Sequence, residues 1–499
     1  MSQVSAKKTA IVSYLSTAFY IVTGFFYTPY LIKVLGVSDY SIFALTASLV
    51  GYFSLDFGIG AAQTRYIAKL LAEKKEEKIQ DVIGITSKLF TLFDLLAVVL
   101  LCIVYFFAED IFKGFTPEEF SRFKEVFVVT ALFIIINIPL LPINGIFLGY
   151  DRAYNLSIIS ASYRVISITA LFLGLIFNVG LFWIVVINVG AQLGMQLFKF
   201  FYIRKKEALK VNIKAHDKEI IKYLASFSSW ATVGIIADKF FFGIIPFLLA
   251  IVSNSNEISI FAIVISLEGY ILSISRSMSG IFLPRIARMI VNGNSPEEHT
   301  RLMTKVGRVQ LYIVGILITA VVCMGDEFVR LWLGEGFQKS YYCLVLVLVP
   351  CLFHLTQTTA EELLFSTNNV KYRAIANIIG SILSVTSILL LGKTLGALAA
   401  GIGVCLSFVF AHNICIDIFY YKKLKLSIGS FLRNCHGKIL PILLIALLIG
   451  EVIKHLVPSA TLWHFLIKGS VWGLITIVIL YFMAFNAEEK QMVKEIIHR

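Results

Sequence analysis

Long apolar runs, separated by short polar segments, fill the whole sequence. Each run is close to the roughly 20 residues that an α-helix needs to cross a bilayer, and none shows the two-residue alternation of an outer-membrane barrel strand. We therefore expect an all-α integral membrane protein. The pattern predicts about 14 transmembrane helices, at 10–32, 41–63, 82–107, 126–149, 156–177, 180–201, 223–250, 259–284, 307–325, 341–365, 374–392, 395–420, 439–456 and 465–486.

Composition agrees with this pattern. Of the 499 residues, 58% are hydrophobic and 15% are charged, whereas a soluble chain carries about 25% charged residues. These values exclude a water-soluble enzyme. The net charge of +13 would suggest nucleic acid as a partner in a soluble protein; in a membrane protein it indicates which connectors stay in the cytoplasm.

The basic residues are distributed unevenly between the two predicted faces. If the N-terminus is inside, 31 of the 44 lysines and arginines fall in the tails and connectors of the inner face, and nine fall on the outer face. This bias predicts that both termini are cytoplasmic. A basic inner face suits an anionic leaflet, so the charge does not require a nucleic-acid partner.

The second predicted span resembles the eighth. SIFALTASLVGY at Ser41–Tyr52 aligns without gaps on SIFAIVISLEGY at Ser259–Tyr270, with eight of twelve positions identical. Pro29 and Pro246 also correspond, near the outer ends of spans one and seven. A shift of six helices preserves orientation, so the sequence predicts two parallel repeats related by an axis along the membrane normal.

The repeat predicts the domain organisation. We expect an N-terminal lobe at 1–201, a basic cytoplasmic linker at 202–222, a C-terminal lobe at 223–420, and two further helices with a cytoplasmic tail at 421–499. Two six-helix lobes of this kind usually enclose a central cavity and expose it alternately to each side. The organisation is therefore typical of a transporter.

Several charged residues lie inside predicted spans, where a charge costs several kcal/mol unless it faces a cavity or a partner. The alternative is that they form ion pairs that only hold helices together. Arg276 stands out because its forked donors suit the phosphate oxygens of an anionic lipid head group. The other members are Asp56, Lys88, Asp94, Arg164, Asp238, Lys239 and Glu268.

Span ten carries a polar stripe. At 100° per residue, His354, Gln357, Thr358 and Glu361 fall within about 100° of one another on an uninterrupted helix. Such a face could bind a coupling cation or a proton. The alternative is that Glu361, near the cytoplasmic end, is simply hydrated.

Signatures of catalysis are missing from the sequence. It has no P-loop, no HExxH and no GxSxG motif, and the residues therefore predict neither an enzyme nor ATP hydrolysis. The seven cysteines form no CxxC pair, so we expect packing roles for them and no metal or other cofactor.

Two segments carry a family resemblance. YTPYLIKVLGVSDYSIFALTASLVGYFSLDFGIGAAQTRYIAK at Tyr27–Lys69 resembles the start of Wzx-type polysaccharide flippases, and FVRLWLG at Phe328–Gly334 resembles their outer segment before helix ten. These flippases belong to the multidrug/oligosaccharidyl-lipid/polysaccharide (MOP) exporter superfamily. Length, span number and two lobes plus two helices match as well, so the resemblance covers essentially the whole chain.

The resemblance implies a function. Wzx-type flippases move undecaprenyl-pyrophosphate-linked oligosaccharide repeat units across the bacterial inner membrane by alternating access, for O-antigen, capsule or exopolysaccharide. It implies membrane lipids, and polysaccharide polymerase or chain-length proteins, as further partners. The candidates for binding the anionic group and sugars are Arg276, Lys239, Arg164 and Lys88, and those for ion coupling are Asp238, Glu268, His354, Glu361 and Asp56.

Other membrane proteins remain alternatives. A MATE-type drug or cation antiporter usually has twelve spans and an acidic site, whereas a lipid II flippase also has 14 spans. A major-facilitator transporter should show a Gly-x-x-x-Asp-Arg motif, and residues 65–81 have none. A membrane glycosyltransferase or polymerase would need a large outer loop, but the longest outer connector, residues 108–125, is short.

Overall fold

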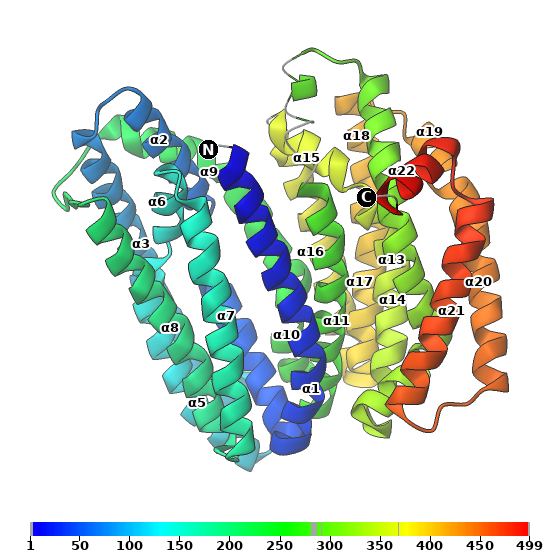
Figure 1. Cartoon of the computed structure of the whole chain (residues 1–499). Coiled ribbons are helices and arrows are strands. Elements are labelled where there is room, and N and C mark those ends of the chain that lie inside the picture. The colour runs from blue at the N-terminus through cyan, green and yellow to red at the C-terminus, as the bar shows by residue number, and fades with distance from the viewer. Residues whose placement is uncertain (1–2, 281–285, 287, 291, 368, 498–499) are drawn as a thin grey trace. The chain divides into compact units, whose positions relative to one another are not determined.

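The computed structural model describes residues 3–497 except 281–285, 287, 291 and 368, and these described residues form helices and no strand (Figure 1). The chain divides into two compact units, Met1–Ala262 (unit 1) and Ile263–Arg499 (unit 2). Helix α11 (Ser255–Gly280) continues from the first into the second.

Unit 1 is built from long apolar helices joined by short turns (Figure 1). Its remaining elements are α1 (Gln3–Phe53), α2 (Ile59–Ala72), α3 (Glu77–Phe106), α4 (Ala108–Ile111), α5 (Pro117–Asn137), η1 (Ile138–Leu140), α6 (Ile143–Gly149), α7 (Ala153–Ile176), α8 (Gly180–Lys206), α9 (Lys218–Asp238), η2 (Lys239–Gly243) and α10 (Ile245–Val252).

Unit 2 has the same character. After α11 it contains α13 (Pro296–Leu333), η3 (Glu335–Phe337), α14 (Gln338–Leu355), α15 (Thr358–Ser366), α16 (Val370–Leu395), α17 (Ala397–Leu406), η4 (Ser407–Cys415), α18 (Ile416–Leu424), α19 (Ile428–Phe431), η5 (Leu432–His436), α20 (Gly437–Leu456), α21 (Leu462–Met483) and α22 (Ala487–Ile497).

Twelve helices in the described residues are long and apolar enough to cross a membrane, and a pair bent by 47°, Thr232–Gly243 with Ile245–Val252, adds a thirteenth if it is one span. The protein is therefore a multi-pass membrane protein. Helix α1 covers the first predicted span and the first part of the second, and Gly36 (φ 83°) breaks its 51 residues into two helices. How many helices cross the bilayer stays a prediction.

The second predicted span, 41–63, is wrong as a single helix. Helix α1 ends at Phe53 and α2 begins only at Ile59. Phe57 (φ 50°) and Gly58 (φ 69°), in the link between them, adopt left-handed backbone conformations that an α-helix cannot contain. Asp56 accepts a hydrogen bond from the Gly58 amide at 3.1 Å and so stabilises the turn.

Element boundaries recur along the chain. Helix α5 begins at Pro117 and η3 at Glu335, and this offset equals the one between Ser41 and Ser259 in the sequence repeat. The first residues of α7 and α16 are as far apart in the sequence as Pro29 and Pro246. The same separation holds for the first residues of α8 and α17. This agreement supports the internal repeat, while the division into two six-helix lobes stays a prediction.

The basic connectors of unit 1 gather at one end. The link between α8 and α9 packs on α3, where the Asn212 amide donates to the Gln80 carbonyl at 3.1 Å. A Cβ atom at Gly84 would lie 1.9 Å from the Asn212 carbonyl oxygen, so only glycine permits this approach. Arg152 pairs with Glu207 at 2.8 Å at the same end. These basic connectors thus lie on one side of unit 1, while the assignment of that side to the cytoplasm stays a prediction.

In unit 2, α20 and α21 pack against α13. A Cβ atom at Gly450 would lie 2.6 Å from Sγ of Cys323, so the absence of a side chain lets α20 approach α13 closely. The indole nitrogen of buried Trp472 donates to the Ala446 carbonyl at 2.9 Å and joins α21 to α20.

Candidate functional site

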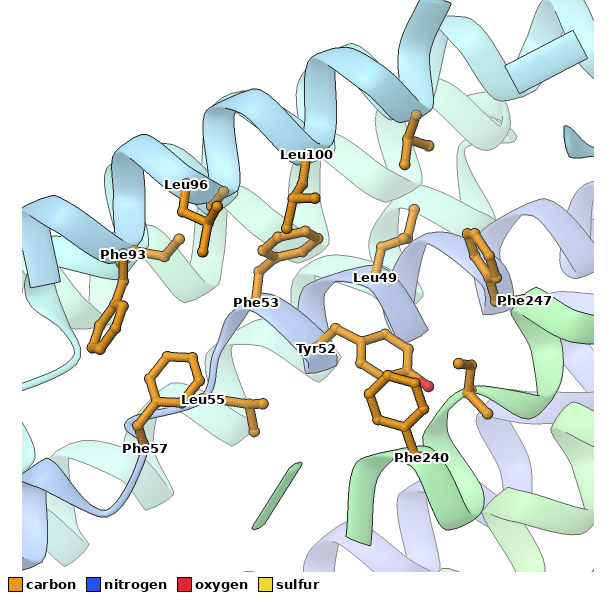
Figure 2. Close-up of a pocket in the computed structure, with 14 residues that line it drawn as sticks. Leu49, Tyr52, Phe53, Leu55, Phe57, Phe93, Leu96, Leu100, Phe240 and Phe247 are labelled. Atoms are coloured by element: carbon orange, nitrogen blue, oxygen red, sulfur yellow. The ribbon is translucent and has the colours of Figure 1, made fainter. Parts of the chain in front are cut away.

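Unit 1 contains an apolar cavity of about 340 Å³ (Figure 2). The volume reaches the roughly 300 Å³ at which small-molecule sites begin. Aromatic rings from several elements surround it, and the only polar side-chain atom among the lining residues is the Tyr52 hydroxyl. The lining residues are Leu49, Tyr52, Phe53, Leu55, Phe57, Phe93, Leu96, Ala97, Leu100, Val104, Ile138, Phe240, Ile244 and Phe247.

The break after α1 contributes Phe57 to the cavity. A positive φ is a marked outlier for a bulky residue and costs about 1–3 kcal/mol. The surrounding structure stabilises it, because the Thr232 hydroxyl of α9 donates to the Phe57 carbonyl. The Phe57 ring lies 4.5 Å, between centroids, from that of Phe93 (Figure 2). The strained turn thus orients a ring toward α3.

Lys239 directly precedes a lining residue of this cavity and contacts another, although it is not itself part of the lining. The Tyr52 hydroxyl donates to the Lys239 carbonyl at 3.3 Å, and the next residue, Phe240, lines the cavity. A Cβ atom at Gly51 would lie 3.8 Å from Nζ of Lys239, which places the ammonium group against α1. Asp238, the preceding residue, is exposed. An apolar cavity next to a cation suits an anionic amphiphile.

The other cationic candidates of unit 1 lie elsewhere. Nη1 of Arg164 is 3.4 Å from the Ser16 carbonyl, and its guanidinium lies 5.4 Å from the centroid of the Tyr20 ring. Lys88 is exposed and donates to the Ala215 carbonyl at 2.8 Å, so it holds the α8–α9 link on α3. Neither residue lines the cavity.

In unit 2, Arg276 is exposed on α11, and its guanidinium lies close enough to the carboxylates of Glu361 and Glu362 to interact with them electrostatically. Glu268, on the same helix, is buried. Glu361 forms an ion pair with Arg373, whose Nη1 is 2.5 Å from Oε1 of Glu361. Arg373 is not among the site residues predicted from the sequence.

The predicted stripe on span ten is wrong as a feature of one helix. Helix α14 ends at Leu355 and α15 begins at Thr358, so the arithmetic of 100° per residue does not apply across the break. The Leu355 carbonyl, which would otherwise accept a helical hydrogen bond, accepts one from the Ser275 hydroxyl at 3.0 Å. His354 instead faces His412 of η4, with ring centroids 5.3 Å apart.

Gln357 and Asp417 form a polar site that the sequence analysis missed. Gln357 is 1% exposed. Its amide lies close to the Asp417 carboxyl, but neither amide atom, nor Oδ1 of Asp417, has a hydrogen bond of good geometry. Buried polar atoms in this state can bind a water molecule or an ion. Asp417 is the only Asp, Glu, Lys or Arg in 395–420, and this signal could have identified it.

No three His, Cys, Asp or Glu side chains in the described part of the chain come together as a metal site. A coupling ion would therefore depend on fewer acidic groups, supplemented by amide, hydroxyl or carbonyl oxygens.

Comparisons with known proteins support the family and the fold. The family model described as "Polysaccharide biosynthesis protein" matches residues 6–290. No curated protein sequence matches the chain.

Several solved structures match most of the length of this chain. The lipid II flippase MurJ, in an inward closed conformation, is 16% identical over 94% of this chain and 99% of that one, with a TM-score of 0.73. An inward-facing MATE multidrug transporter is 15% identical over 85% and 99%, with a TM-score of 0.59. A MOP transporter from Pyrococcus furiosus is 13% identical over 84% and 96%, with a TM-score of 0.58. The expected MOP-like all-α fold is confirmed.

Proposed function

The chain belongs to the family of polysaccharide biosynthesis proteins, and we propose that it is a flippase for lipid-linked oligosaccharides. Its substrate is an undecaprenyl-pyrophosphate-linked repeat unit, moved from the cytoplasmic to the outer leaflet of a bacterial inner membrane. The product serves O-antigen, capsule or exopolysaccharide synthesis. Both termini are cytoplasmic in this proposal, and polymerase or chain-length proteins receive the translocated unit.

The observation that carries this proposal is the cation beside an apolar cavity in unit 1. A polyprenyl pyrophosphate joins an apolar chain to a strongly anionic group, and Lys239 and the aromatic cavity supply the matching chemistry within one unit. A hydrogen bond to a charged group contributes about 1.5–3 kcal/mol. Lys239 would bind a phosphate oxygen while the part of the chain nearest the phosphate occupies the cavity.

Arg276 of unit 2 is a separate candidate for binding the anionic group, independent of the unit 1 cavity. Its exposed guanidinium can donate two parallel hydrogen bonds to phosphate oxygens. Arg164 and Lys88 have backbone partners, so binding of substrate would require each to exchange a carbonyl for a phosphate or sugar oxygen. We place them second to Lys239 and Arg276 for this reason.

Ion coupling would bias the exchange between inward and outward states. The candidates remain Asp56, Asp238, Glu268, His354 and Glu361. To them we add Asp417, because its carboxyl adjoins the buried Gln357 amide. A carboxylate at membrane depth with no cationic partner is costly, and binding a proton or a cation would relieve that cost.

A transport assay with purified protein tests the proposal. Proteoliposomes are loaded separately with an undecaprenyl-pyrophosphate-linked oligosaccharide, lipid II and a cationic dye. We expect transfer of the oligosaccharide lipid between leaflets, and its loss in Arg276→Ala protein that is still inserted. Transfer of lipid II alone, or of the dye alone, would replace the proposal by the corresponding alternative. In cells, normal surface polymer with Arg276→Ala would remove Arg276 from the site.

A further inference from the structure

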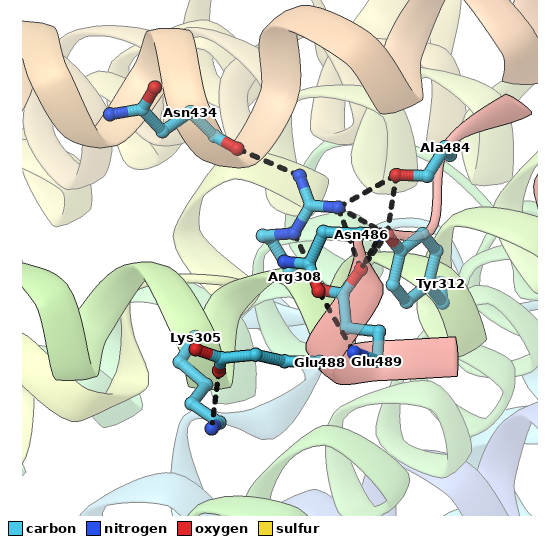
Figure 3. Close-up of polar contacts among 8 residues, drawn as sticks. All are labelled: Lys305, Arg308, Tyr312, Asn434, Ala484, Asn486, Glu488 and Glu489. Atoms are coloured by element: carbon cyan, nitrogen blue, oxygen red, sulfur yellow. Dashed lines mark hydrogen bonds and ion pairs between the residues drawn. The ribbon is translucent and has the colours of Figure 1, made fainter. Parts of the chain in front are cut away.

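A buried ion pair fixes the C-terminal helix of unit 2. Arg308 of α13 binds both carboxylate oxygens of Glu489 of α22, with Nε–Oε1 2.6 Å and Nη2–Oε2 2.8 Å (Figure 3). The guanidinium also donates to the Tyr312 hydroxyl and to the carbonyls of Asn434 and Ala484. Arg308 is thereby committed to protein partners.

Two polar cavities adjoin Arg308, and they differ in charge. One, of about 790 Å³, is lined by basic residues and by four carboxylates, those of Glu297, Glu298, Glu488 and Glu489. The other, of about 1030 Å³, has Arg308, Arg433 and Lys438 in its lining and no carboxylate at all. The second cavity, which lies between α13, η5 and the end of α21, therefore attracts an anion.

The cations that could bind such an anion are Arg433 and Lys438. Both side chains are exposed, and neither forms an ion pair with any residue that the structure describes. The hydroxyls of Thr304 and Ser430 line the same cavity. The Ser430 hydroxyl can donate a hydrogen bond to a ligand, whereas the Thr304 hydroxyl donates to the Thr300 carbonyl at 2.8 Å and can accept one. The cavity therefore combines charged and neutral hydrogen-bond donors, as phosphate-binding sites do.

The cavity lies where two apolar helices end. Lys438 is the second residue of α20, and Met483, which also lines the cavity, is the last residue of α21. Beyond these ends the helices expose large apolar side chains, with Leu448 64% and Phe482 69% exposed. A ligand with an anionic head and acyl chains would satisfy both regions.

We propose that this cavity binds the head group of an anionic glycerophospholipid, whose acyl chains lie along the exposed faces of α20 and α21. Arg433 and Lys438 contact the phosphate, and the hydroxyls of Thr304 and Ser430 contact the remaining head-group oxygens. Basic pockets between helices at the cytoplasmic side are suited to such lipids. The bound lipid would join α13 to α20 and α21 beside the Arg308–Glu489 pair.

Native mass spectrometry of the detergent-purified full chain tests this site. Phosphatidylglycerol, phosphatidylcholine and inorganic phosphate are added separately to the unmodified protein and to Arg433→Gln/Lys438→Gln. The matched control is Lys205→Gln/Lys206→Gln, which removes two exposed cations from the end of α8. Thermal unfolding of each variant without added lipid checks that it is folded.

We expect one retained phosphatidylglycerol per chain, with an affinity reduced roughly tenfold to thirtyfold in the Arg433/Lys438 variant and unchanged in the control. Equal retention by the two double variants would overturn the proposal. So would equal binding of phosphatidylcholine, which would show that the head-group charge is irrelevant. Binding of inorganic phosphate as tight as that of the lipid would show an anion site in place of a lipid site.

Discussion

Lys468 of α21 and Glu327 of α13 form an ion pair, Nζ–Oε2 2.5 Å, in which the two side chains are 4% and 5% exposed. The Ser459 amide donates to the other carboxylate oxygen at 2.6 Å, and Lys468 also donates to the Val457 carbonyl at 3.0 Å. Together with Arg308–Glu489, this pair joins α13 to the C-terminal segment at two well-separated positions along α13.

Removing one partner of the Glu327–Lys468 pair should destabilise the protein strongly. Lys468→Ala leaves a buried carboxylate without a cation, which typically costs about 3–5 kcal/mol. We expect a clearly lower Tm in detergent, and recovery of most of it in Glu327→Leu/Lys468→Leu, because an apolar pair needs no charge compensation. Lys454→Ala is the control, since the Lys454–Asp326 pair is partly exposed. Equal losses from Lys468→Ala and Lys454→Ala would contradict the prediction.

The Arg308–Glu489 pair should make stability depend on pH. Burial alone would raise the pKa of Glu489, but the hydrogen bond from Arg308 and that from the Asn486 amide outweigh it, and the pKa lies below its usual 4.5. Because the pKa of Glu489 is lower in the folded than in the unfolded state, its ionised carboxylate stabilises the folded protein above pH 4.5. This stabilisation is lost as the pH falls through the folded-state pKa. Glu489→Gln should therefore lower Tm at pH 7, and the difference from the unmodified protein should narrow toward pH 4.

The control for this titration is Glu488→Gln. Glu488 is the neighbouring carboxylate, 78% exposed, and pairs with Lys305 at 3.1 Å. Exposed pairs of this kind contribute about 0–1 kcal/mol, so Tm should barely change at any pH. A Glu489→Gln variant whose Tm tracks the unmodified protein between pH 7 and pH 4 would show that the ion pair contributes no stability.

The membrane helices and their charge bias could be predicted because both depend on local composition. Over the residues that the structure describes, each predicted span overlaps at least one helix, although 41–63 and 341–365 are interrupted, and the basic connectors of unit 1 gather at one end. The break at Thr356–Gln357 could not be predicted, because neither residue is a glycine or proline. Contacts distant in sequence stabilise it: the Ser275 hydroxyl donates to the Leu355 carbonyl, and Gln310 donates to the Thr358 hydroxyl at 2.7 Å.

The candidate site was harder to predict than the fold. Charges inside apolar runs make Lys239 and Arg276 candidates, and their roles stay predictions. Ion pairing depends on residues far apart in the sequence, as in Arg308 and Glu489. Lys88 looked like an intramembrane cation, whereas the structure shows it bound to the α8–α9 link. The aromatic cavity had no sequence signal, since its lining residues come from several separate segments.

The charge of Lys239 should be required for substrate binding. If its ammonium binds a phosphate oxygen, Lys239→Gln should weaken binding of the lipid-linked oligosaccharide about tenfold to a hundredfold, and Lys239→Arg should retain most of it. Lys33→Gln, at an exposed position in α1, is the control. Binding to purified protein is measured with a fluorescent lipid-linked oligosaccharide. Unchanged affinity in Lys239→Gln would exclude Lys239 from the site.

Filling the unit 1 cavity should block the prenyl chain without unfolding the protein. Ala97 of α3 lines the cavity, so Ala97→Phe places a ring in space that the chain would occupy. Overpacking costs about 1–3 kcal/mol, which thermal unfolding can separate from a loss of binding. The control, Val99→Phe, puts the same ring on an exposed face of α3 outside the cavity. We expect Ala97→Phe to lose binding of the prenylated oligosaccharide and Val99→Phe to keep it; if folded Ala97→Phe protein binds normally, the cavity is not the site of the chain.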